Sequence, residues 1–157
     1  MKHIISLIVE NKPGVLARIS GLFSARGYNI SSLAVSETLD PTTSYMTMVV
    51  NAEDERVLEQ IKKQLNKLID VITVIDFTKK EHIDRELVLI KVTCQQKDLD
   101  KLKSILKKYS HYILKVLQDT VIIEMTGNQE EIKDFIEDMK TFGIKELVRT
   151  GRIAISQ

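Results

Sequence analysis

The sequence predicts an α+β protein made of two consecutive βαββαβ units, each an antiparallel sheet with two helices on one face. Three observations support this prediction. Apolar residues recur at strand and helix spacing in the order strand, helix, strand, strand, helix, strand over residues 1–77. The same order begins again after the charged segment Lys79–His82. The chain has 157 residues, which is enough for two such units with modest cores.

The first strand is predicted over residues 4–9, which are apolar at nearly every position, as in a strand covered on both faces. Pro13 suits the first turn of a following helix, because the N–H that proline lacks would be unpaired there. Lys12 is then the expected N-cap, and Gly27 is the expected left-handed end of the helix. The apolar face of this helix is formed by Val15, Leu16, Ile19, Leu22 and Phe23.

Two further strands are separated by a turn at Asp40-Pro41. Their apolar positions are Ile30, Leu33 and Val35 on one strand and Met46, Met48 and Val50 on the other. A second helix is indicated by Leu58, Ile61, Leu65 and Leu68. Val71–Phe77 supplies the fourth strand, which completes the element order of a ferredoxin-like unit.

The break at Lys79–His82 is the predicted linker, so we expect residues 1–77 to form one domain and residues 78–157 the other. The second domain begins with a strand over Leu87–Cys94, followed by a helix with Leu99, Leu102, Leu106 and Tyr109 on its apolar face. A hairpin then turns at Gln118-Asp119 and joins strands over Tyr112–Leu117 and Val121–Met125.

The last helix is predicted from Asn128 and Glu131, which have the spacing of a capping box. Its apolar face is formed by Ile132, Phe135, Ile136 and Met139. Gly143 ends the helix, and the final strand is predicted over Ile144–Ile155. Each unit therefore covers one sheet face with helices and leaves the other face or an edge open. Because residues 4–9 are apolar on both sides, we expect a homodimer to cover the remainder.

The composition excludes several functional classes. Apolar residues make up 43% of the chain and charged residues 29%, as in ordinary globular proteins. A net charge of +1 gives no general attraction to nucleic acid or to an anionic membrane. The single cysteine, Cys94, forms no internal disulfide and suits a reducing compartment. Glu10 interrupts the N-terminal apolar run and no cleavage site follows, so we expect a cytoplasmic protein.

No pattern of catalytic or metal-binding residues is present. His3, His82 and His111 lie in three different predicted elements, and the serines near residue 32 have no histidine at workable spacing. A basic helical face is formed by Lys97, Lys101, Lys103, Lys107 and Lys108. Since Asp98 and Asp100 interrupt it and no aromatic platform lies nearby, a solvated face explains it better than a nucleic-acid interface.

The most informative segment is the Pro-Gly corner over Glu10–Leu16, which joins the first strand to the first helix. Lysine is a poor N-cap, so the N–H groups of Gly14, Val15 and Leu16 are expected to be free for an outside carboxylate. Gly14 has no side chain, which lets a ligand approach the backbone closely.

Two carboxamides extend this site. Asn11 and Asn29 can both donate and accept hydrogen bonds, which suits a zwitterion with a carboxylate and an ammonium group. An aliphatic ligand body is favoured by Val15, Leu16, Ile30 and Val35. The alternative from spacing alone is that Asn11 makes an Asx-turn onto Gly14 and that the corner has no ligand.

At this point the sequence resembles the ACT domain of the acetohydroxyacid (acetolactate) synthase small subunit. The resemblance is carried by Glu10–Leu16, Arg18-Ile19, Gly21–Phe23, Arg26–Ile30, Asp40-Pro41 and Lys67–Val71. In the second half it continues through Arg85–Leu87, Leu89–Val92, Thr126-Gly127 and Glu146–Gly151. It thus covers nearly the whole chain.

The resemblance implies a non-catalytic regulatory subunit. In that family the small subunit activates a catalytic large subunit that carries thiamine diphosphate, Mg²⁺ and FAD, and it confers feedback inhibition by valine or a related branched-chain amino acid. The effector lies between the corner of one protomer and the Asn29 strand of the other. The effector contacts carried over to this chain are Asn11, Gly14, Val15, Leu16, Asn29 and Ile30. A free-standing amino-acid sensor that controls transcription is the alternative function.

Two departures from the family pattern are visible. Tyr45 stands where the family usually has arginine. Lys108-Tyr109-Ser110 and Leu114-Lys115-Val116 replace a helix end and a strand of different composition. Both departures are expected to alter contact with the catalytic partner, and neither changes the corner.

Overall fold

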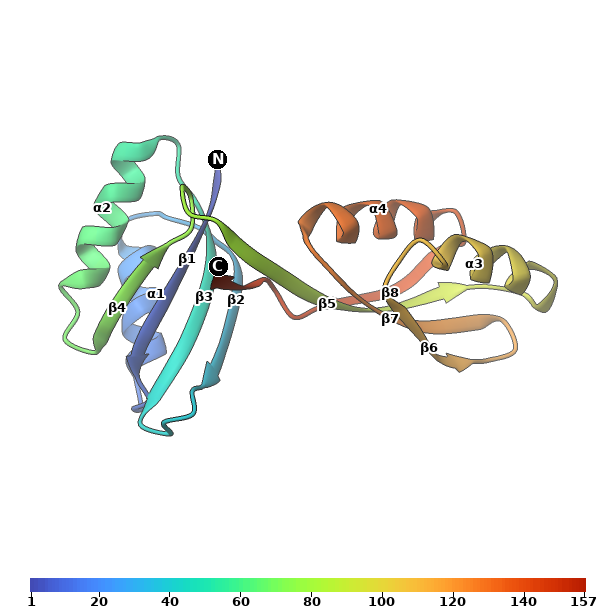
Figure 1. Ribbon diagram of the computed structural model, residues 1–157, viewed down its shortest axis with the longest axis horizontal. Helices are drawn as coiled ribbons and strands as arrows, with labels where there is room; N and C mark the ends of the chain where they lie inside the picture. Colours follow the sequence, from blue (N-terminus) through green and yellow to red (C-terminus); the bar gives the residue numbers. More distant parts are fainter. The chain divides into compact units, whose positions relative to one another are not determined.

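Two units with the same element order make up the structure, a computed structural model that describes residues 1–157 (Figure 1). Unit 1 contains Met1–Ile83 together with Arg152–Gln157, and unit 2 contains Asp84–Gly151. The predicted division after residue 77 differs from this arrangement in two respects. The chain leaves unit 1 later, after Ile83, and residues 152–157 return to unit 1.

Unit 1 has the predicted order β1 (Lys2–Glu10), α1 (Val15–Ala25), β2 (Ile30–Glu37), β3 (Thr43–Asn51), α2 (Glu55–Asn66) and β4 (Val71–Asp76). Its strands form a sheet in the order β2-β3-β1-β4, and all neighbours are antiparallel. The first sheet face packs against both helices, with Ile5 and Leu7 of β1 and Met48 of β3 buried against Phe23 and Leu65. The α+β prediction is confirmed for this unit.

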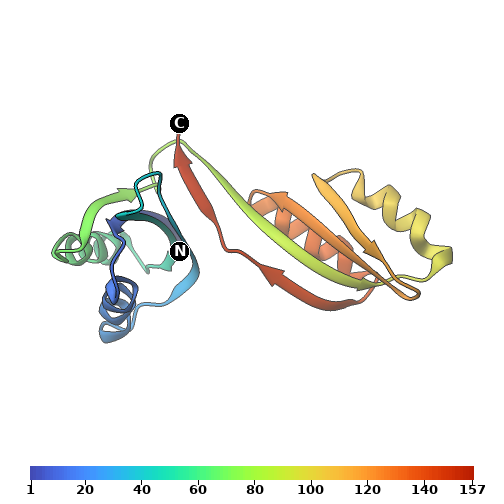
Figure 2. The ribbon, with the colours of Figure 1, turned by 90° about the horizontal axis from the view of Figure 1, so that it is seen from below.

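The second face of this sheet is covered by the end of the chain. Ala154 is buried there with Ile4, Val49 and Phe77 in a separate apolar cluster. Figure 2 shows the helices on one side of the sheet and the C-terminal strand on the other. The predicted final strand over Ile144–Ile155 is therefore wrong as a single element. It divides into β8 (Ile144–Arg149) and β9 (Ile153–Ser156), because the chain turns at Gly151, whose φ is 85°.

Unit 2 contains η1 (Gln96–Asp98), α3 (Leu99–Leu106), β6 (His111–Val116), β7 (Thr120–Gly127), α4 (Gln129–Lys140) and β8. Strand β5 (His82–Thr93) begins in unit 1 and continues into unit 2, where the strand order is β6-β7-β5-β8. The predicted capping box is confirmed: Asn128 Oδ1 accepts from the Glu131 N–H, and Glu131 Oε2 accepts from the Asn128 N–H.

The core of unit 2 holds the chain's cysteine. Cys94 is only 4% exposed and belongs to the same apolar cluster as Ile90, Leu102 and Phe135. Burial raises the pKa of its thiol, with a smaller contribution from Asp98. Tyr109 packs edge-on against Phe135. No helix of the structure is long and apolar enough to cross a membrane.

Candidate functional site

The corner between β1 and α1 differs from the prediction in where the helix starts. Gly14, not Lys12, is the N-cap, and Pro13 lies before the helix. Gly14 has a φ of 85°, in the left-handed region that favours glycine. This turn delays helical dihedrals until Val15, which explains why the predicted N-cap was wrong.

Free backbone donors remain at this helix start. No side chain caps α1, and the N–H groups of Gly14, Leu16 and Ala17 have no partner in the chain. The Val15 N–H, which was predicted to be free, donates to the Lys12 carbonyl at 3.3 Å. The set of free amides is therefore shifted by one residue, and it still points out of the helix N-terminus, where an anion is stabilised.

Arg18 and Asp70 are two site residues that sequence reasoning missed. The Arg18 Nε donates to Asp70 Oδ2 at 2.7 Å; the Asp70 side chain is 10% exposed and the Arg18 side chain 49%. A Cβ atom built on Gly14 would lie 2.9 Å from Arg18 Nη1, so the guanidinium lies directly against the corner. Arg18 follows Gly14 by four residues, and this one-turn spacing was the signal available in the sequence.

Asn11 connects the corner to the turn between β2 and β3. Its side-chain amide donates to the Pro41 carbonyl at 2.9 Å, and its backbone N–H donates to the Thr42 carbonyl at 2.8 Å. The Gly14 N–H makes no hydrogen bond to the Asn11 side chain, so the alternative of an Asx-turn onto Gly14 is wrong. Because the nitrogen of the carboxamide donates to Pro41, the oxygen of Asn11 is the atom that can accept a hydrogen bond from a ligand.

Asn29 lies at the opposite end of the sheet from this corner. Its carbonyl accepts from the N–H of Asn51, the last residue of β3, whereas Asn11 is bonded to Thr42, just before β3 begins. The nine residues of β3 separate the two asparagines by roughly 25 Å. One copy of the chain thus divides the six predicted contacts into two groups. Asn11, Gly14, Val15 and Leu16 are at one end, and Asn29 and Ile30 are at the other.

Side-chain exposure within these groups is uneven. Val15 is buried in the core of unit 1, while Leu16 is exposed beside the corner. Ile30 is half-buried, and Asn29 is exposed in a hollow of about 420 Å³ that Tyr28 and Asn51 also line. Of the four predicted aliphatic side chains, Leu16 and Val35 are the two exposed to a ligand or a partner.

Strand β2 is at the edge of its sheet, with β3 as its only neighbour. An edge strand presents unpaired backbone groups to a further strand. The register pairs Glu37 with Ser44 and Ile30 with Val50, so β2 ends at the corner end of the sheet and begins at the Asn29 end. If two copies paired antiparallel through β2, the Asn29 end of one copy would lie beside the corner end of the other.

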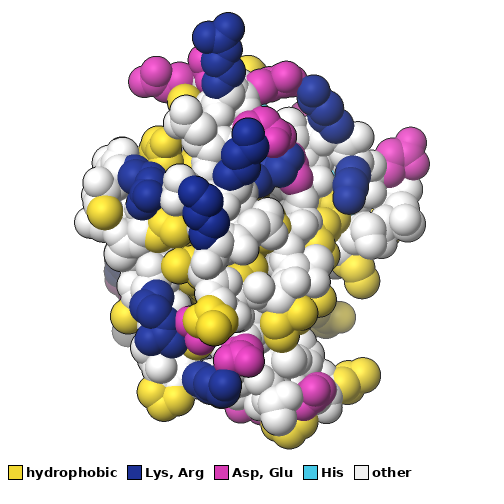
Figure 3. Space-filling model, turned by 90° about the vertical axis from the view of Figure 1, so that its left-hand side faces the viewer, with side chains coloured by type: hydrophobic (Ala, Val, Ile, Leu, Met, Phe, Trp, Pro, Cys, Tyr) yellow, Lys and Arg dark blue, Asp and Glu magenta, His cyan; other side chains and the backbone are white.

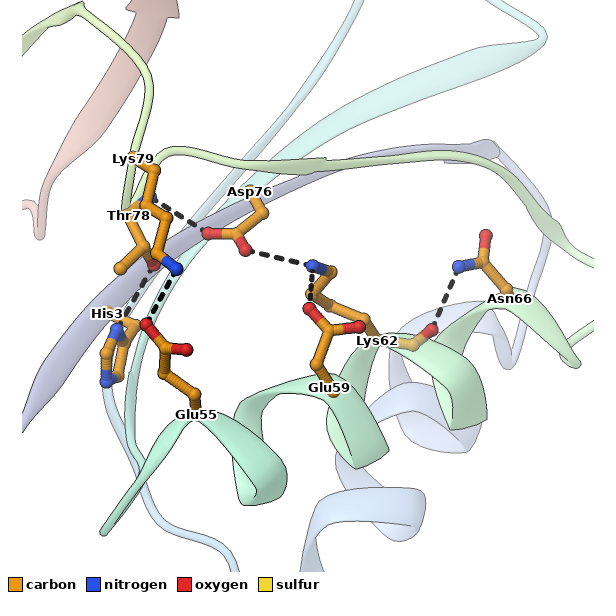
Figure 4. A network of polar contacts seen from close by, with 8 residues as sticks. All are labelled: His3, Glu55, Glu59, Lys62, Asn66, Asp76, Thr78 and Lys79. Carbon is orange, nitrogen blue, oxygen red and sulfur yellow. Dashed lines mark hydrogen bonds and ion pairs between the residues drawn. The ribbon is translucent and has the colours of Figure 1, made fainter.

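A second concentration of polar groups lies between α2 and the end of β4 (Figure 4). Lys62 bonds Asp76 Oδ2 at 3.1 Å, and Asp76 Oδ1 accepts from the Thr78 N–H at 2.9 Å. The Thr78 hydroxyl bonds His3 Nδ1, and Lys79 pairs with Glu55 at 2.7 Å. These charges are paired with one another, so the network fastens α2 to β4 and offers no free charge of one sign to a ligand.

The pH dependence of this network follows from Asp76. Burial pushes the pKa of Asp76 upward, but hydrogen bonds from Thr78 and the ion pair with Lys62 outweigh it, and the pKa lies below its ordinary value. A lowered folded-state pKa contributes stability above the unfolded-state pKa, and this is lost as the pH falls through the folded-state pKa.

Asp76→Asn is expected to lower the free energy of unfolding by about 0.5–1 kcal/mol at pH 7 and by almost nothing near pH 2–3. Urea unfolding of both proteins at the two pH values measures the difference. Glu53→Gln is the control, because the Glu53 carboxylate is exposed and makes no ion pair. An equal loss for Asp76→Asn at both pH values would contradict the role of the charge.

Charges elsewhere are mixed in sign. On the side of unit 1 shown in Figure 3, basic and acidic side chains alternate with apolar ones and form no field of one sign. In unit 2, Lys108 lies in the turn after α3 and pairs with Asp138, and Lys101 on α3 lies 5.9 Å from the ring of Phe142. His3, His82 and His111 lie on β1, β5 and β6, and no three His, Cys, Asp or Glu residues are grouped for a metal ion.

Both halves of the chain match known families. Residues 5–73 match the family described as "AHAS small subunit-like ACT domain". Residues 85–157 match the family described as "Small subunit of acetolactate synthase". The two matches coincide closely with the two βαββαβ units.

Individual proteins show the same similarity over the whole chain. The chain is 45% identical over 155 residues to a probable acetolactate synthase small subunit of Archaeoglobus fulgidus, covering 99% of this chain and 96% of that protein. It is 41% identical over 157 residues to the acetolactate synthase small subunit of Bacillus subtilis, covering 100% and 91%. The crystal structure of the acetolactate synthase small subunit from Thermotoga maritima matches with a TM-score of 0.88 at 33% identity, covering 100% and 98%.

Proposed function

The chain belongs to the family of acetolactate synthase small subunits, and we propose that it is a regulatory subunit with no catalysis of its own. It binds the catalytic large subunit, raises its activity and makes it subject to feedback inhibition by a branched-chain amino acid. Valine is the first candidate effector. The partner, and not this chain, holds thiamine diphosphate, Mg²⁺ and FAD.

The proposed effector site is shared by two copies of the chain. The corner of one copy offers the amides of Gly14, Leu16 and Ala17 and the guanidinium of Arg18 to the carboxylate. Asn29 of the second copy offers a carboxamide oxygen to the ammonium group. The observation that supports this arrangement most strongly is the position of Asn11 and Asn29 at opposite ends of β3, in a sheet whose free edge is β2.

An effector bound between two copies stabilises the arrangement of copies to which it binds more tightly. It changes the catalytic partner only through this difference in affinity, which in typical allosteric proteins amounts to about 1–3 kcal/mol. The two copies then present the catalytic subunit with a different surface.

The test combines the purified chain with the catalytic subunit from the same source. Acetolactate formation is measured with and without this chain, and with valine, leucine or isoleucine added. We expect the chain to raise the rate and one of the amino acids to remove the increase. An unchanged rate would contradict the proposal. Salt-dependent binding of the chain to duplex DNA would favour a transcriptional sensor instead.

Arg18→Gln is expected to weaken valine binding by roughly 10-fold to 100-fold, because a charged hydrogen bond to the carboxylate contributes about 1.5–3 kcal/mol. Titration calorimetry on the folded variant measures the loss. Arg56→Gln is the matched control: it removes the same charge from an exposed position on α2. Equal valine affinity for Arg18→Gln and Arg56→Gln would remove Arg18 from the site, while the amides and asparagines would still be open to test.

A further inference from the structure

Residues 152–157, the C-terminal strap, lie on the sheet of unit 1 after the chain has completed unit 2. Two hydroxyl groups hold the strap to that sheet. The Arg152 N–H donates to Ser32 Oγ of β2 at 3.0 Å. The Tyr45 hydroxyl of β3 donates to the Ala154 carbonyl at 3.2 Å.

The strap buries little apolar surface. Ala154 is 7% exposed, but its neighbours Ile153 and Ile155 are 56% and 64% exposed. At the end of the strap, the Gln157 N–H donates to the Glu81 carbonyl at 3.4 Å, and β9 pairs with β5. A short segment that buries one alanine and leaves its two isoleucines largely exposed opens more readily than the core of the sheet.

The strap also contacts the strand that the proposed effector site uses. Ser32 follows Ile30 by two residues, and the pairing of β2 with β3 shifts register between them. Ordering of Asn29 and Ile30 by a ligand therefore acts on the same short stretch of β2 that positions the Ser32 hydroxyl. The strap joins this stretch to Gly151, the last residue of unit 2.

We propose that the C-terminal strap is a releasable segment of unit 1, held by the hydroxyls of Ser32 and Tyr45 in addition to its pairing with β5, and that its release responds to the state of β2. The coupling to a ligand rests on the proposed function, whereas the release of the strap does not. An effector that orders β2 shifts the strap toward its docked state.

Amide hydrogen exchange in the full-length chain, followed residue by residue by NMR, tests the release. The readout is the exchange of Ile155, Ser156 and Gln157, whose amides touch neither hydroxyl. Ser32→Ala and Tyr45→Phe are each expected to accelerate it fivefold to tenfold, with an unchanged urea midpoint for global unfolding. Ser31→Ala is the matched control for the first variant, since the Ser31 hydroxyl bonds Asn51 instead. Tyr112→Phe, at an exposed tyrosine of unit 2, is the control for the second.

Two results would contradict the proposal that the strap is released. One is wild-type exchange in both variants. The other is strap exchange as slow as that of the core amides of β1, which would show that the strap opens only with global unfolding.

Valine then tests the coupling between the ligand and the strap: it is expected to slow strap exchange in the wild-type chain and to do so less in Ser32→Ala. If calorimetry shows that valine binds but strap exchange is unchanged, the proposed coupling between the ligand and the strap is contradicted. If valine does not bind, the proposed effector site is contradicted, and the exchange rates measured without valine still test whether the strap is released.

Discussion

Gly14→Asp is expected to abolish inhibition by the branched-chain effector while activation of the catalytic subunit is kept. The new carboxylate would take the place of the effector's own carboxylate beside Arg18, whose Nη1 lies 2.9 Å from the position of a Cβ on Gly14. Loss of the charged contacts and repulsion of the ligand should weaken binding by roughly 100-fold or more, about 3 kcal/mol. Inhibition curves and titration calorimetry with valine measure this loss.

Two controls separate the effect of charge from that of backbone strain. Gly14→Ala imposes a side chain at a φ of 85° but adds no charge, so it should weaken binding less than Gly14→Asp. Gly21→Asp adds the same side chain to the same helix at a position with open space around it, and should leave inhibition unchanged. Wild-type sensitivity to valine in Gly14→Asp would remove the corner from the effector site.

Two inactive variants are expected to restore an effector site when they are combined in one dimer. Gly14→Asp removes the corner, and Asn29→Ala removes the carboxamide at the other end of β3. A dimer with one copy of each holds one site in which both halves are altered and one site in which both halves are intact. Calorimetry on this mixed dimer, purified through two different tags, should therefore find one valine per dimer with wild-type affinity.

The control redistributes the same substitutions. A chain carrying both Gly14→Asp and Asn29→Ala, paired with a wild-type chain, has one altered half in each of its two sites. This dimer should bind no valine at wild-type affinity. One valine bound by this control dimer and none by the first mixed dimer would show that each site lies within one copy, in contradiction to the roughly 25 Å separation along β3.

The element order could be predicted from the sequence because each element of these units carries its own periodicity. The capping box at Asn128 was found for the same reason, since its donors and acceptors are three residues apart. The helix start at Val15 was missed, because a Pro-Gly pair does not specify whether proline lies inside the first helical turn or glycine forms a left-handed N-cap after it. The pairing of Arg18 with Asp70 joins residues 52 positions apart, which no local pattern reports.

The return of residues 152–157 to unit 1 was also beyond sequence reasoning. Their apolar residues continue the alternation of β8, so the sequence pattern predicts a single strand that contains both β8 and β9. The turn at Gly151 and the cluster of Ala154 with Ile4 and Val49 separate them. For the ligand site, the sequence supplied the residues, while the structure showed that one copy keeps the two groups apart.

Because Cys94 is buried in unit 2, the reaction of its thiol reports on the opening of that unit. It is the chain's single thiol, and it is enclosed in the core of unit 2 with its proton held more tightly than usual. A maleimide dye therefore labels the chain only during excursions that expose that core. The labelling rate therefore measures how often the core of unit 2 opens.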